Sequence, residues 1–320
     1  MESKIVVDAP PFLRILGDGT VHRMLGFEKV PSSLDGPVAS KDVASDGVSV
    51  RLYLPTHALH SDGVKLPVVV YFHGGGFCVA SATCPEYHNY LNLVAEEANV
   101  ACVSVDYRLA PEHRLPAAYD DCFAALQWLA RQAQAQQNPH GVGFEPEPWL
   151  FSHADFSKCF LAGDSAGANI VHEMGIRASE SGKDFAFAGC ILAHPFFCAE
   201  EDMGSEVSPH AEPLRKTRNA MLKIFLPPGE DRDYPPLNPW GPRSPPLAKL
   251  RVYPRVLVIV SGKDMLKDRG ILYQEALVKE GIVADLMKIE DEEHVFHLLD
   301  LRCQNATLMM KRISEFIHMN

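Results

Sequence analysis

The chain has 320 residues, of which 47% are hydrophobic and 22% are charged, and it carries a formal net charge of −11 at neutral pH. This composition is typical of a globular protein with a large core, and the acidic balance argues against nucleic acid or an anionic membrane surface as a partner. No stretch is apolar over the length that a bilayer crossing requires, so membrane insertion is not expected.

Strand-like and helix-like segments alternate through most of the chain, which predicts an α/β fold with a mostly parallel sheet covered by helices on both faces. Because α/β enzymes of this length often form one continuous sheet, we expect residues 1–320 to be a single domain. The predicted strands are a half-exposed edge strand over 48–54 and buried strands over 68–72, 100–105, 159–162, 189–194, 256–260 and 284–289. Helical spacing predicts helices over 119–136, 273–280 and 306–316, the last with Leu308 on its inner face.

Two regions interrupt this alternation. Residues 1–47 show little periodic structure, and residues 198–246 combine one amphipathic stretch with a proline-rich tail. Long insertions beside an active site usually act as lids or pocket walls, although a surface excursion without a role is the alternative. We expect both regions to contribute to a cap.

The first motif that carries chemistry is Gly163-Asp164-Ser165-Ala166-Gly167, which matches G-x-S-x-G. It stands between a predicted strand and a predicted helix, as the elbow that lifts a nucleophilic serine does. Glycines on both sides let the chain turn sharply without a Cβ clash. The motif predicts Ser165 as a nucleophile.

The second motif is His73-Gly74-Gly75-Gly76, directly after the strand over 68–72. Glycine N–H groups at a strand's carboxyl end can stabilise a developing negative charge. We therefore expect the N–H groups of Gly75, Gly76 and Ala166 to form an oxyanion hole, with His73 and Gly74 supporting the loop. Either motif can arise by chance, but both in this order indicate an enzyme.

A serine nucleophile needs a histidine base oriented by a carboxylate, and with this kind of elbow the chain order is serine, acid, histidine. Asp264 follows the strand over 256–260 and is the expected acid. Asp268 is the weaker candidate, because it should already lie on a helix, as an ion-pair residue beside Arg269.

His294 follows the last predicted strand and is the expected base, whereas His297, one turn further on, should be a packing or surface residue. In the resulting mechanism Ser165 attacks an ester carbonyl, and the acyl-enzyme is then hydrolysed. This chemistry needs no metal, nucleotide or organic cofactor. The expected partner is a small-molecule ester, and no oligomeric state follows from the sequence.

Apolar residues near the motifs and in the expected cap indicate a pocket for a small to medium apolar ester, although each alone could belong to the core. The expected pocket residues are Phe77, Asp164, Phe196, Phe225 and Val295.

Four ordered motifs resemble those of plant carboxylesterases, in the hormone-sensitive-lipase-like (GDXG) branch of the α/β-hydrolases. They are His73-Gly74-Gly75-Gly76-Phe77, the block from Asp106 to Glu112, Gly163-Asp164-Ser165-Ala166-Gly167, and the block from Asp264 to Gly270. The resemblance extends from about Phe12 to the C-terminus. It implies an α/β-hydrolase fold, a Ser165–Asp264–His294 triad, a cap built from N-terminal and inserted helices, and a structural role for the block around Tyr107.

Relatives of this kind keep other functions open. Some are cyclases or dehydratases of specialised metabolism, and an intact triad can persist beside such an activity. Gibberellin receptors share the scaffold but lack the catalytic histidine, so His294 weighs against a receptor. Acetylated metabolites, lactone hormones and xenobiotic esters are all candidate substrates.

The N-terminus shows no apolar segment of a secretory signal, and the 8 cysteines are scattered without a C-x-x-C pair. Buried reduced thiols are the expected interpretation. The sequence therefore predicts a cytoplasmic protein, with the nucleus as a second location.

Overall fold

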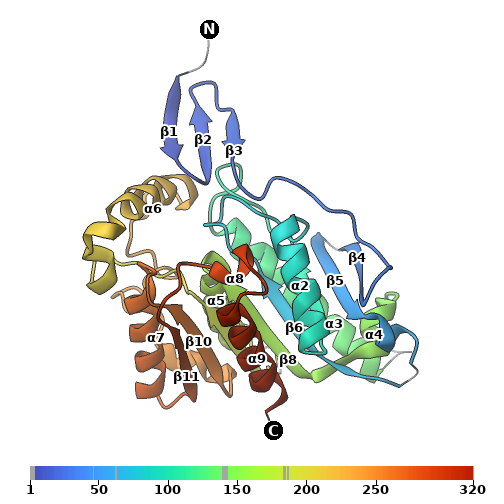
Figure 1. The fold of residues 1–320 in the computed structure, drawn as a ribbon. Helices are drawn as coiled ribbons and strands as arrows, with labels where there is room; N and C mark the ends of the chain where they lie inside the picture. The colour runs from blue at the N-terminus through green and yellow to red at the C-terminus, as the bar shows by residue number, and fades with distance from the viewer. Residues whose placement is uncertain are drawn as a thin grey trace.

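A central eight-stranded sheet runs through the computed structural model, which describes residues 4–45, 47–61, 63–138, 143–182, 185 and 187–319 (Figure 1). The strand order is β11-β10-β9-β8-β6-β7-β5-β4; β5 runs antiparallel to both of its neighbours, β7 and β4, and the other pairings are parallel. The bounds are β4 (Val38–Ser45), β5 (Val48–Pro55), β6 (Leu66–Phe72), β7 (Ala101–Val105), β8 (Ala154–Asp164), β9 (Gly189–Ala193), β10 (Val256–Ser261) and β11 (Ala284–Ile289).

Buried parallel strands explain the long apolar runs in the sequence. Every residue of β6 is buried, and its side chains alternate between the two faces: Val68 and Val70 enter one core cluster, Val69 and Tyr71 the other. The pairing register brings Phe72 beside Gly163. The end of β6 therefore lies next to the turn that follows β8.

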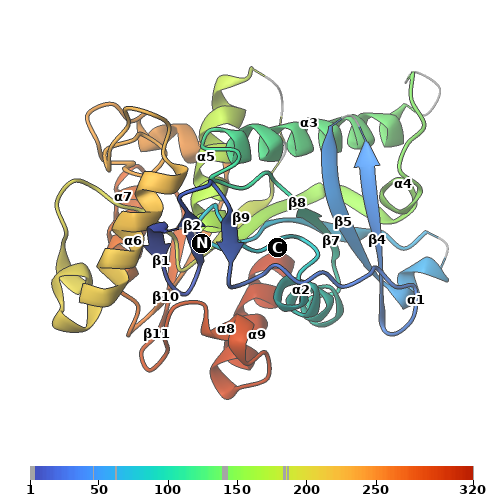
Figure 2. The same ribbon diagram turned by 90° about the horizontal axis from the view of Figure 1, so that it is seen from above.

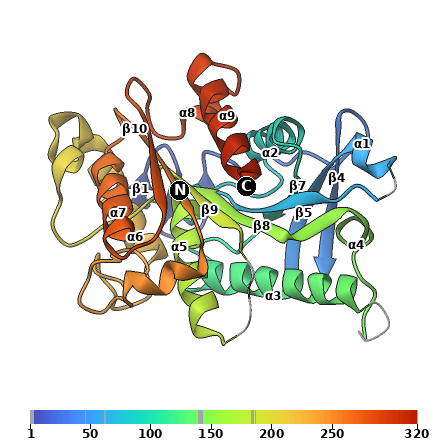
Figure 3. The ribbon, with the colours of Figure 1, turned by 90° about the horizontal axis from the view of Figure 1, so that it is seen from below.

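Helices cover both faces of the sheet, as Figures 2 and 3 show from two opposite directions. One core cluster joins the sheet to α3 (Ala117–Gln137), α5 (Ala166–Glu180) and α7 (Lys267–Lys279), and the other joins it to α2 (Pro85–Glu97) and α9 (Gln304–His318). The shorter helices are α1 (Thr56–Leu59), α4 (Pro148–His153) and α8 (Phe296–Leu299). No helix among these described segments has both the length and the apolar character needed to cross a membrane.

A cap lies over one end of the sheet. It combines a small antiparallel sheet of β1 (Ile5–Ala9), β2 (Leu13–Leu16) and β3 (Val21–Arg23) with helix α6 (Glu212–Phe225) (Figure 1). The 3-10 turns η1 (Gly204–Val207) and η2 (Pro209–Ala211) lead into α6, and η3 (Leu247–Val252) follows it. The Thr217 hydroxyl of α6 donates to the Pro10 carbonyl at 2.9 Å. The two parts of the cap are thereby joined directly.

The N-terminal region differs from expectation in two ways. Its cap segments are strands and not helices, and residues 38–45 form β4 of the main sheet, so the expected range 1–47 extends too far. Strand β4 forms the edge of the main sheet, and β5, which was expected to be the edge strand, lies between β4 and β7. Apolar runs in the sequence do not indicate β4, because its residues around Asp42 are polar; the Asp42 carboxylate accepts a hydrogen bond from Arg51 at 2.6 Å.

The last helix also differs in one detail. Leu308, expected on the inner face, is 52% exposed, whereas Ile313 and Phe316 are buried. The inward face of α9 is completed by Met309 and Met310 instead.

Candidate active site

Ser165 occupies a sharp turn between β8 and α5. Its backbone has φ 53° and ψ −117°, a region that residues with a side chain rarely adopt. Close packing requires the glycine that follows: a Cβ on Gly167 would lie 1.9 Å from the Phe72 carbonyl oxygen. The Ser165 N–H donates to the Ala193 carbonyl at 2.9 Å, which ties the turn to the end of β9.

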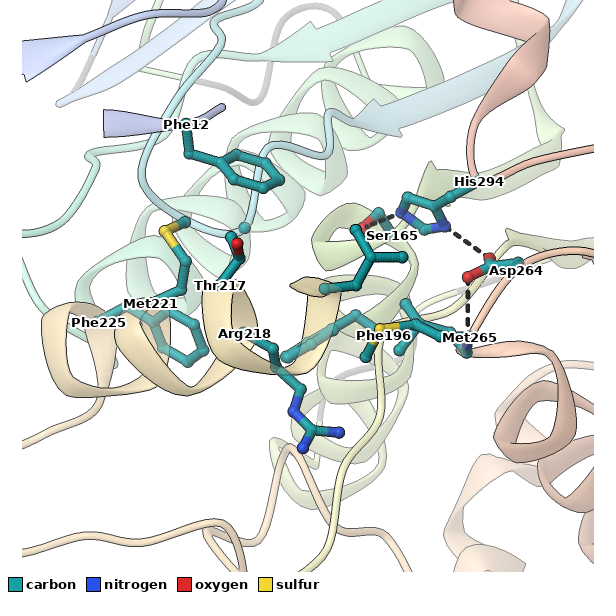
Figure 4. Close-up of a pocket in the computed structure, with 13 residues that line it drawn as sticks. Phe12, Ser165, Phe196, Thr217, Arg218, Met221, Phe225, Asp264, Met265 and His294 are labelled. Carbon is teal, nitrogen blue, oxygen red and sulfur yellow. Dashed lines mark hydrogen bonds and ion pairs between the residues drawn. The ribbon is translucent and has the colours of Figure 1, made fainter. Parts of the chain in front are cut away.

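Three side chains from the carboxyl ends of three strands meet at this turn (Figure 4). His294 Nε2 lies 2.9 Å from Ser165 Oγ, and His294 Nδ1 lies 2.6 Å from Asp264 Oδ2. The second Asp264 oxygen accepts the Leu266 N–H at 2.9 Å, which fixes the carboxylate. The structure thus brings together the three residues expected to form the triad, in the expected order of contact.

Burial and charge shift the pKa values of Asp264 and His294 in opposite directions. Burial alone would raise the pKa of the Asp264 carboxyl, but the charge and hydrogen bond of His294 outweigh it and hold that pKa below its usual range. For His294, burial alone would lower the pKa, and the Asp264 charge and hydrogen bond raise it above the usual value. The aspartate is therefore held ionised and the imidazole is made more basic.

The loop after β6 lies beside Ser165. Gly75 and Gly76 have φ values of 96° and 59°, and a Cβ on Gly75 would lie 2.2 Å from the Val79 carbonyl oxygen. Within the described part of the chain, no acceptor binds the N–H groups of Gly75, Gly76 or Ala166. Gly76 lines the same cavity as Ser165, so the Gly76 N–H is free to bind an oxygen there.

His73 lies behind this loop. Its Nδ1–H donates to the Gly74 carbonyl at 2.8 Å, and its ring stacks on Tyr107 with 4.1 Å between centroids. The Tyr107 hydroxyl donates to the His73 carbonyl at 2.7 Å. Burial lowers the pKa of His73 to about 4, so the ring is neutral near pH 7. These contacts fit a bracing role and give Tyr107 a structural one.

Asp164 does not line the cavity, contrary to expectation. Its buried carboxylate accepts hydrogen bonds from the Tyr71 hydroxyl at 2.7 Å and the Tyr87 hydroxyl at 2.8 Å. The Tyr87 oxygen in turn accepts the Gly74 N–H at 2.7 Å. Burial raises the pKa of Asp164, and the two tyrosine hydrogen bonds oppose that shift. Asp164 therefore connects the serine turn to the glycine loop from beneath.

A cavity of about 120 Å³ opens above Ser165 and His294 (Figure 4). Phe196 and Phe225 line it as expected, whereas Phe77 and Val295 do not. Phe77 is 1% exposed and packs beneath the cavity, with 5.0 Å between its ring centroid and that of Phe225. The apolar lining residues that sequence reasoning missed are Phe12, Leu214, Met221, Met265 and Leu266.

Two further histidines are buried near His294: His297, which was expected to be a packing or surface residue, and His194, which sequence reasoning missed. The His194 ring centroid lies 5.7 Å from that of His294 and 5.3 Å from that of His297, and His194 Nε2 lies 2.9 Å from Ser261 Oγ. Burial lowers the pKa of His297 to about 3 and that of His194 well below its usual value. Both rings are therefore neutral near pH 7, and His194 contacts the His294 ring on one side and the His297 ring on the other. The position of His194 at the end of the strand predicted over 189–194 was the available sequence signal.

Buried ion pairs fasten the cap to the helix that follows Asp264. Glu206, fully buried on η1, accepts from Arg218 of α6 at 2.7 Å and from Arg269 of α7 at 2.9 Å. Asp268 accepts the Ser205 N–H at 2.6 Å. Asp268 lies on α7, as expected. Arg269, however, forms its ion pair with Glu206 and not with Asp268.

The described residues contain no group of three or more histidine, cysteine, aspartate or glutamate side chains arranged to hold a metal ion.

Comparison with known proteins agrees with the fold. A family model described as alpha/beta hydrolase fold matches residues 69–298. The chain is 41% identical to tuliposide A-converting enzyme 1, chloroplastic, of Tulipa gesneriana, over 99% of this chain and 79% of that protein. It is 38% identical to the 2-hydroxyisoflavanone dehydratase of Glycine max, over 99% and 100% of the two chains. Among solved structures, a Pyrobaculum calidifontis esterase superposes with a TM-score of 0.68 at 28% identity, over 88% of this chain and 84% of that one.

The expected cytoplasmic and nuclear location is contradicted by these relatives. The Tulipa gesneriana enzymes at 41% and 38% identity are named chloroplastic and amyloplastic. The absence of a secretory pattern and of paired cysteines argued only against the secretory route and could not separate the cytoplasm from an organelle.

Proposed function

Because the chain belongs to the α/β-hydrolase family, we propose that Ser165, His294 and Asp264 act together in catalysis and that the protein is a serine carboxylesterase. The observation that carries the proposal is the unbroken line of hydrogen bonds from Ser165 Oγ through His294 to Asp264, at 2.9 and 2.6 Å. An oriented base next to an exposed hydroxyl is the arrangement that activates serine for attack on a carbonyl.

In the proposed mechanism His294 Nε2 takes the Ser165 proton as Oγ attacks the ester carbon. Asp264 holds the Nδ1–H tautomer and stabilises the imidazolium. The N–H groups of Gly75, Gly76 and Ala166 bind the oxyanion, a contribution of about 3–4 kcal/mol for each essential donor. His294 then protonates the leaving alcohol, and a water activated by the same histidine releases the acid from Ser165.

The cavity limits the acyl group. Its volume of about 120 Å³ and its wall of Phe12, Met221 and Phe225 suit a small to medium apolar acyl chain. Acetylated metabolites, lactones and xenobiotic esters all meet this requirement.

The test is hydrolysis of p-nitrophenyl esters from acetate to octanoate by the wild type and by Ser165→Ala. We expect turnover that favours the shorter chains and falls by about 10⁴–10⁶-fold in the variant. Near-normal turnover by a folded Ser165→Ala protein would exclude Ser165 as the nucleophile.

A second candidate is a dehydratase or cyclase built on the same site. It is favoured by the 38% identity to a 2-hydroxyisoflavanone dehydratase over the whole chain. His294 would then act as a general base on a carbon-bound proton instead of on Ser165. A folded protein that hydrolyses no ester would favour this function, and binding without turnover of any substrate would favour a receptor.

We also propose a plastid location, on the names of the relatives. Expression of the full-length coding sequence fused at its C-terminus to a fluorescent protein in leaf cells tests this. Signal that coincides with chlorophyll or stained starch granules supports it, and a diffuse signal contradicts it.

A further inference from the structure

Helix α2 places a tyrosine hydroxyl beneath the glycine loop. Tyr87, in the first turn of α2, is 4% exposed, and its hydroxyl oxygen accepts the Gly74 N–H at 2.7 Å. The same hydroxyl donates to Asp164 Oδ2 at 2.8 Å. Burial and the Asp164 charge raise the pKa of Tyr87 well above its usual value, so the hydroxyl keeps the proton that it donates. A directed chain of two hydrogen bonds therefore links Gly74 to the residue before Ser165.

The backbone at Gly74 is adapted to this contact. Gly74 does not have the positive φ of Gly75 and Gly76, so its own conformation does not require a glycine. A Cβ at position 74, however, would lie 2.4 Å from Asp164 Oδ2 and 2.8 Å from the Tyr87 hydroxyl oxygen. The absence of a side chain therefore lets the backbone approach both groups closely enough for the hydrogen bond to form.

The loop that follows needs such contacts, because its backbone is strained. Residues 75–77 have φ values of 96°, 59° and 61°, and Phe77 carries a side chain in this left-handed region. A conformation of this kind persists only where the surrounding structure holds it. At one end of the loop the Phe77 carbonyl accepts the Ala110 N–H at 2.9 Å, and at the other end Tyr87 holds the Gly74 N–H. The expected oxyanion donors lie between these two anchors.

A second tyrosine offers an internal comparison. The Tyr71 hydroxyl, from strand β6, donates to the other Asp164 oxygen at 2.7 Å, and Tyr71 is 3% exposed. Among the described residues, this hydroxyl forms no hydrogen bond with the glycine loop. Tyr71 and Tyr87 therefore share an acceptor and a degree of burial, and they differ in the hydrogen bond to Gly74.

We propose that Tyr87 is a positioning residue for the oxyanion hole. Its hydroxyl, oriented by Asp164, fixes Gly74 and so holds the two N–H groups that follow it where the oxyanion forms. Such donors stabilise the transition state fully only at hydrogen-bond distance from the developing charge, so a shift of the loop lowers kcat more than it raises KM. The proposal rests on the esterase function proposed above.

The test compares Tyr87→Phe with Tyr71→Phe on p-nitrophenyl butyrate. Each change removes one hydroxyl donor to Asp164 and keeps the aromatic ring, but only Tyr87→Phe also removes the acceptor of the Gly74 N–H. We expect Tyr87→Phe to lower kcat by about 10–30-fold with little change in KM, because a displaced donor loses part of the factor of about 10²–10³ that a deleted donor loses. Tyr71→Phe should stay within about threefold of the wild-type kcat.

A transition-state analogue separates positioning from a general disturbance of the pocket. Butyl trifluoromethyl ketone reacts with Ser165: a bond forms between Oγ and the carbonyl carbon, the π electron pair moves onto the carbonyl oxygen, and His294 takes the hydroxyl proton. The alcohol hexan-2-ol has the same carbon chain and no carbonyl group. For Tyr87→Phe we expect the Ki of the ketone to rise by the factor by which kcat/KM falls, and the Ki of the alcohol to stay unchanged. Hydrogen exchange of the loop N–H groups should be faster in Tyr87→Phe and not in Tyr71→Phe.

Two other outcomes overturn the inference in distinguishable ways. If Tyr87→Phe loses no more kcat than Tyr71→Phe, or if the Ki of the alcohol rises together with that of the ketone, Tyr87 has only a structural role and the esterase function stands. If the folded wild type hydrolyses no ester and does not bind the ketone, the esterase function itself is wrong and the role of Tyr87 falls with it.

Discussion

Asp264 and Asp268 are four residues apart in the chain, yet their carboxylates have different surroundings. Asp264 is 3% exposed and bonded to His294, whereas Asp268 accepts from the backbone of Ser205 in the cap. Chain position after a strand predicted Asp264 as the acid in preference to Asp268, and Asp264 is the one of the two that contacts His294. It could not identify the partner of Asp268, because that contact depends on a cap segment more than sixty residues away.

The two aspartates give a paired prediction. Asp264→Asn should lower kcat by about 10³–10⁴-fold, because the amide favours the wrong imidazole tautomer. Asp268→Asn keeps a similar shape and acceptor and should retain most of the activity. Steady-state kinetics on p-nitrophenyl butyrate with both purified variants measures this, and the reverse ranking would show that Asp268 is the catalytic acid.

The pH dependence of kcat/KM follows from the pKa of His294. The imidazole must be unprotonated to act as a base, so activity is lost as the pH falls through that pKa. Burial lowers the pKa of His294, but the charge and hydrogen bond of Asp264 have the larger effect and raise this pKa above the ordinary value of about 6.5. The acid limb should therefore have its midpoint above that value and should move to lower pH in Asp264→Asn. A midpoint that does not move would mean that another group titrates.

At the scale of elements, the site is made by strand ends. Strands β8, β10 and β11 are neighbours or near neighbours in one parallel array, so the loops after them bring Ser165, Asp264 and His294 to one edge. This part of the fold could be predicted, because strands buried on both faces appear as continuous apolar runs. The α/β-hydrolase fold expected from these runs and motifs is confirmed.

Other elements were missed for identifiable reasons. Helix α2 had a readable signal, since its buried residues Tyr87, Tyr90, Leu91 and Val94 follow helical spacing. Strands β1 to β3 had none, because they are short and their outer residues are exposed: Val6 is 59% exposed. Their stability depends on packing against α6, which no local pattern reveals.

The buried ion pairs of the cap give a prediction about stability. Glu206→Gln would leave Arg269 buried without a compensating charge and would leave Arg218 with the Asp202 carboxylate as its ion-pair partner, and it should lower the free energy of unfolding by about 3 kcal/mol or more. The control is Glu180→Gln, which breaks an exposed pair with Lys249 and should cost about 1 kcal/mol or less. Urea unfolding followed by circular dichroism measures both, and equal effects would contradict the role given to Glu206.

At the scale of the whole molecule, the cavity is assembled from segments that are distant in sequence. Phe12 comes from the N-terminal sheet, Met221 from the inserted helix, and Ser165 and His294 from the main sheet. Sequence position near a motif is therefore a poor guide to the lining. Phe77, next to the glycine loop, packs under the cavity, whereas Phe12, far from every motif, lines it.

The measurement that tests the central claim most directly is covalent labelling with a fluorophosphonate, which reacts only with an activated serine. Intact-mass analysis followed by peptide mapping should find one label on Ser165, with none on Ser165→Ala and a greatly slowed reaction in His294→Ala. A label on another residue, or no label on a folded wild-type protein that hydrolyses esters, would contradict the assignment of Ser165 as the nucleophile.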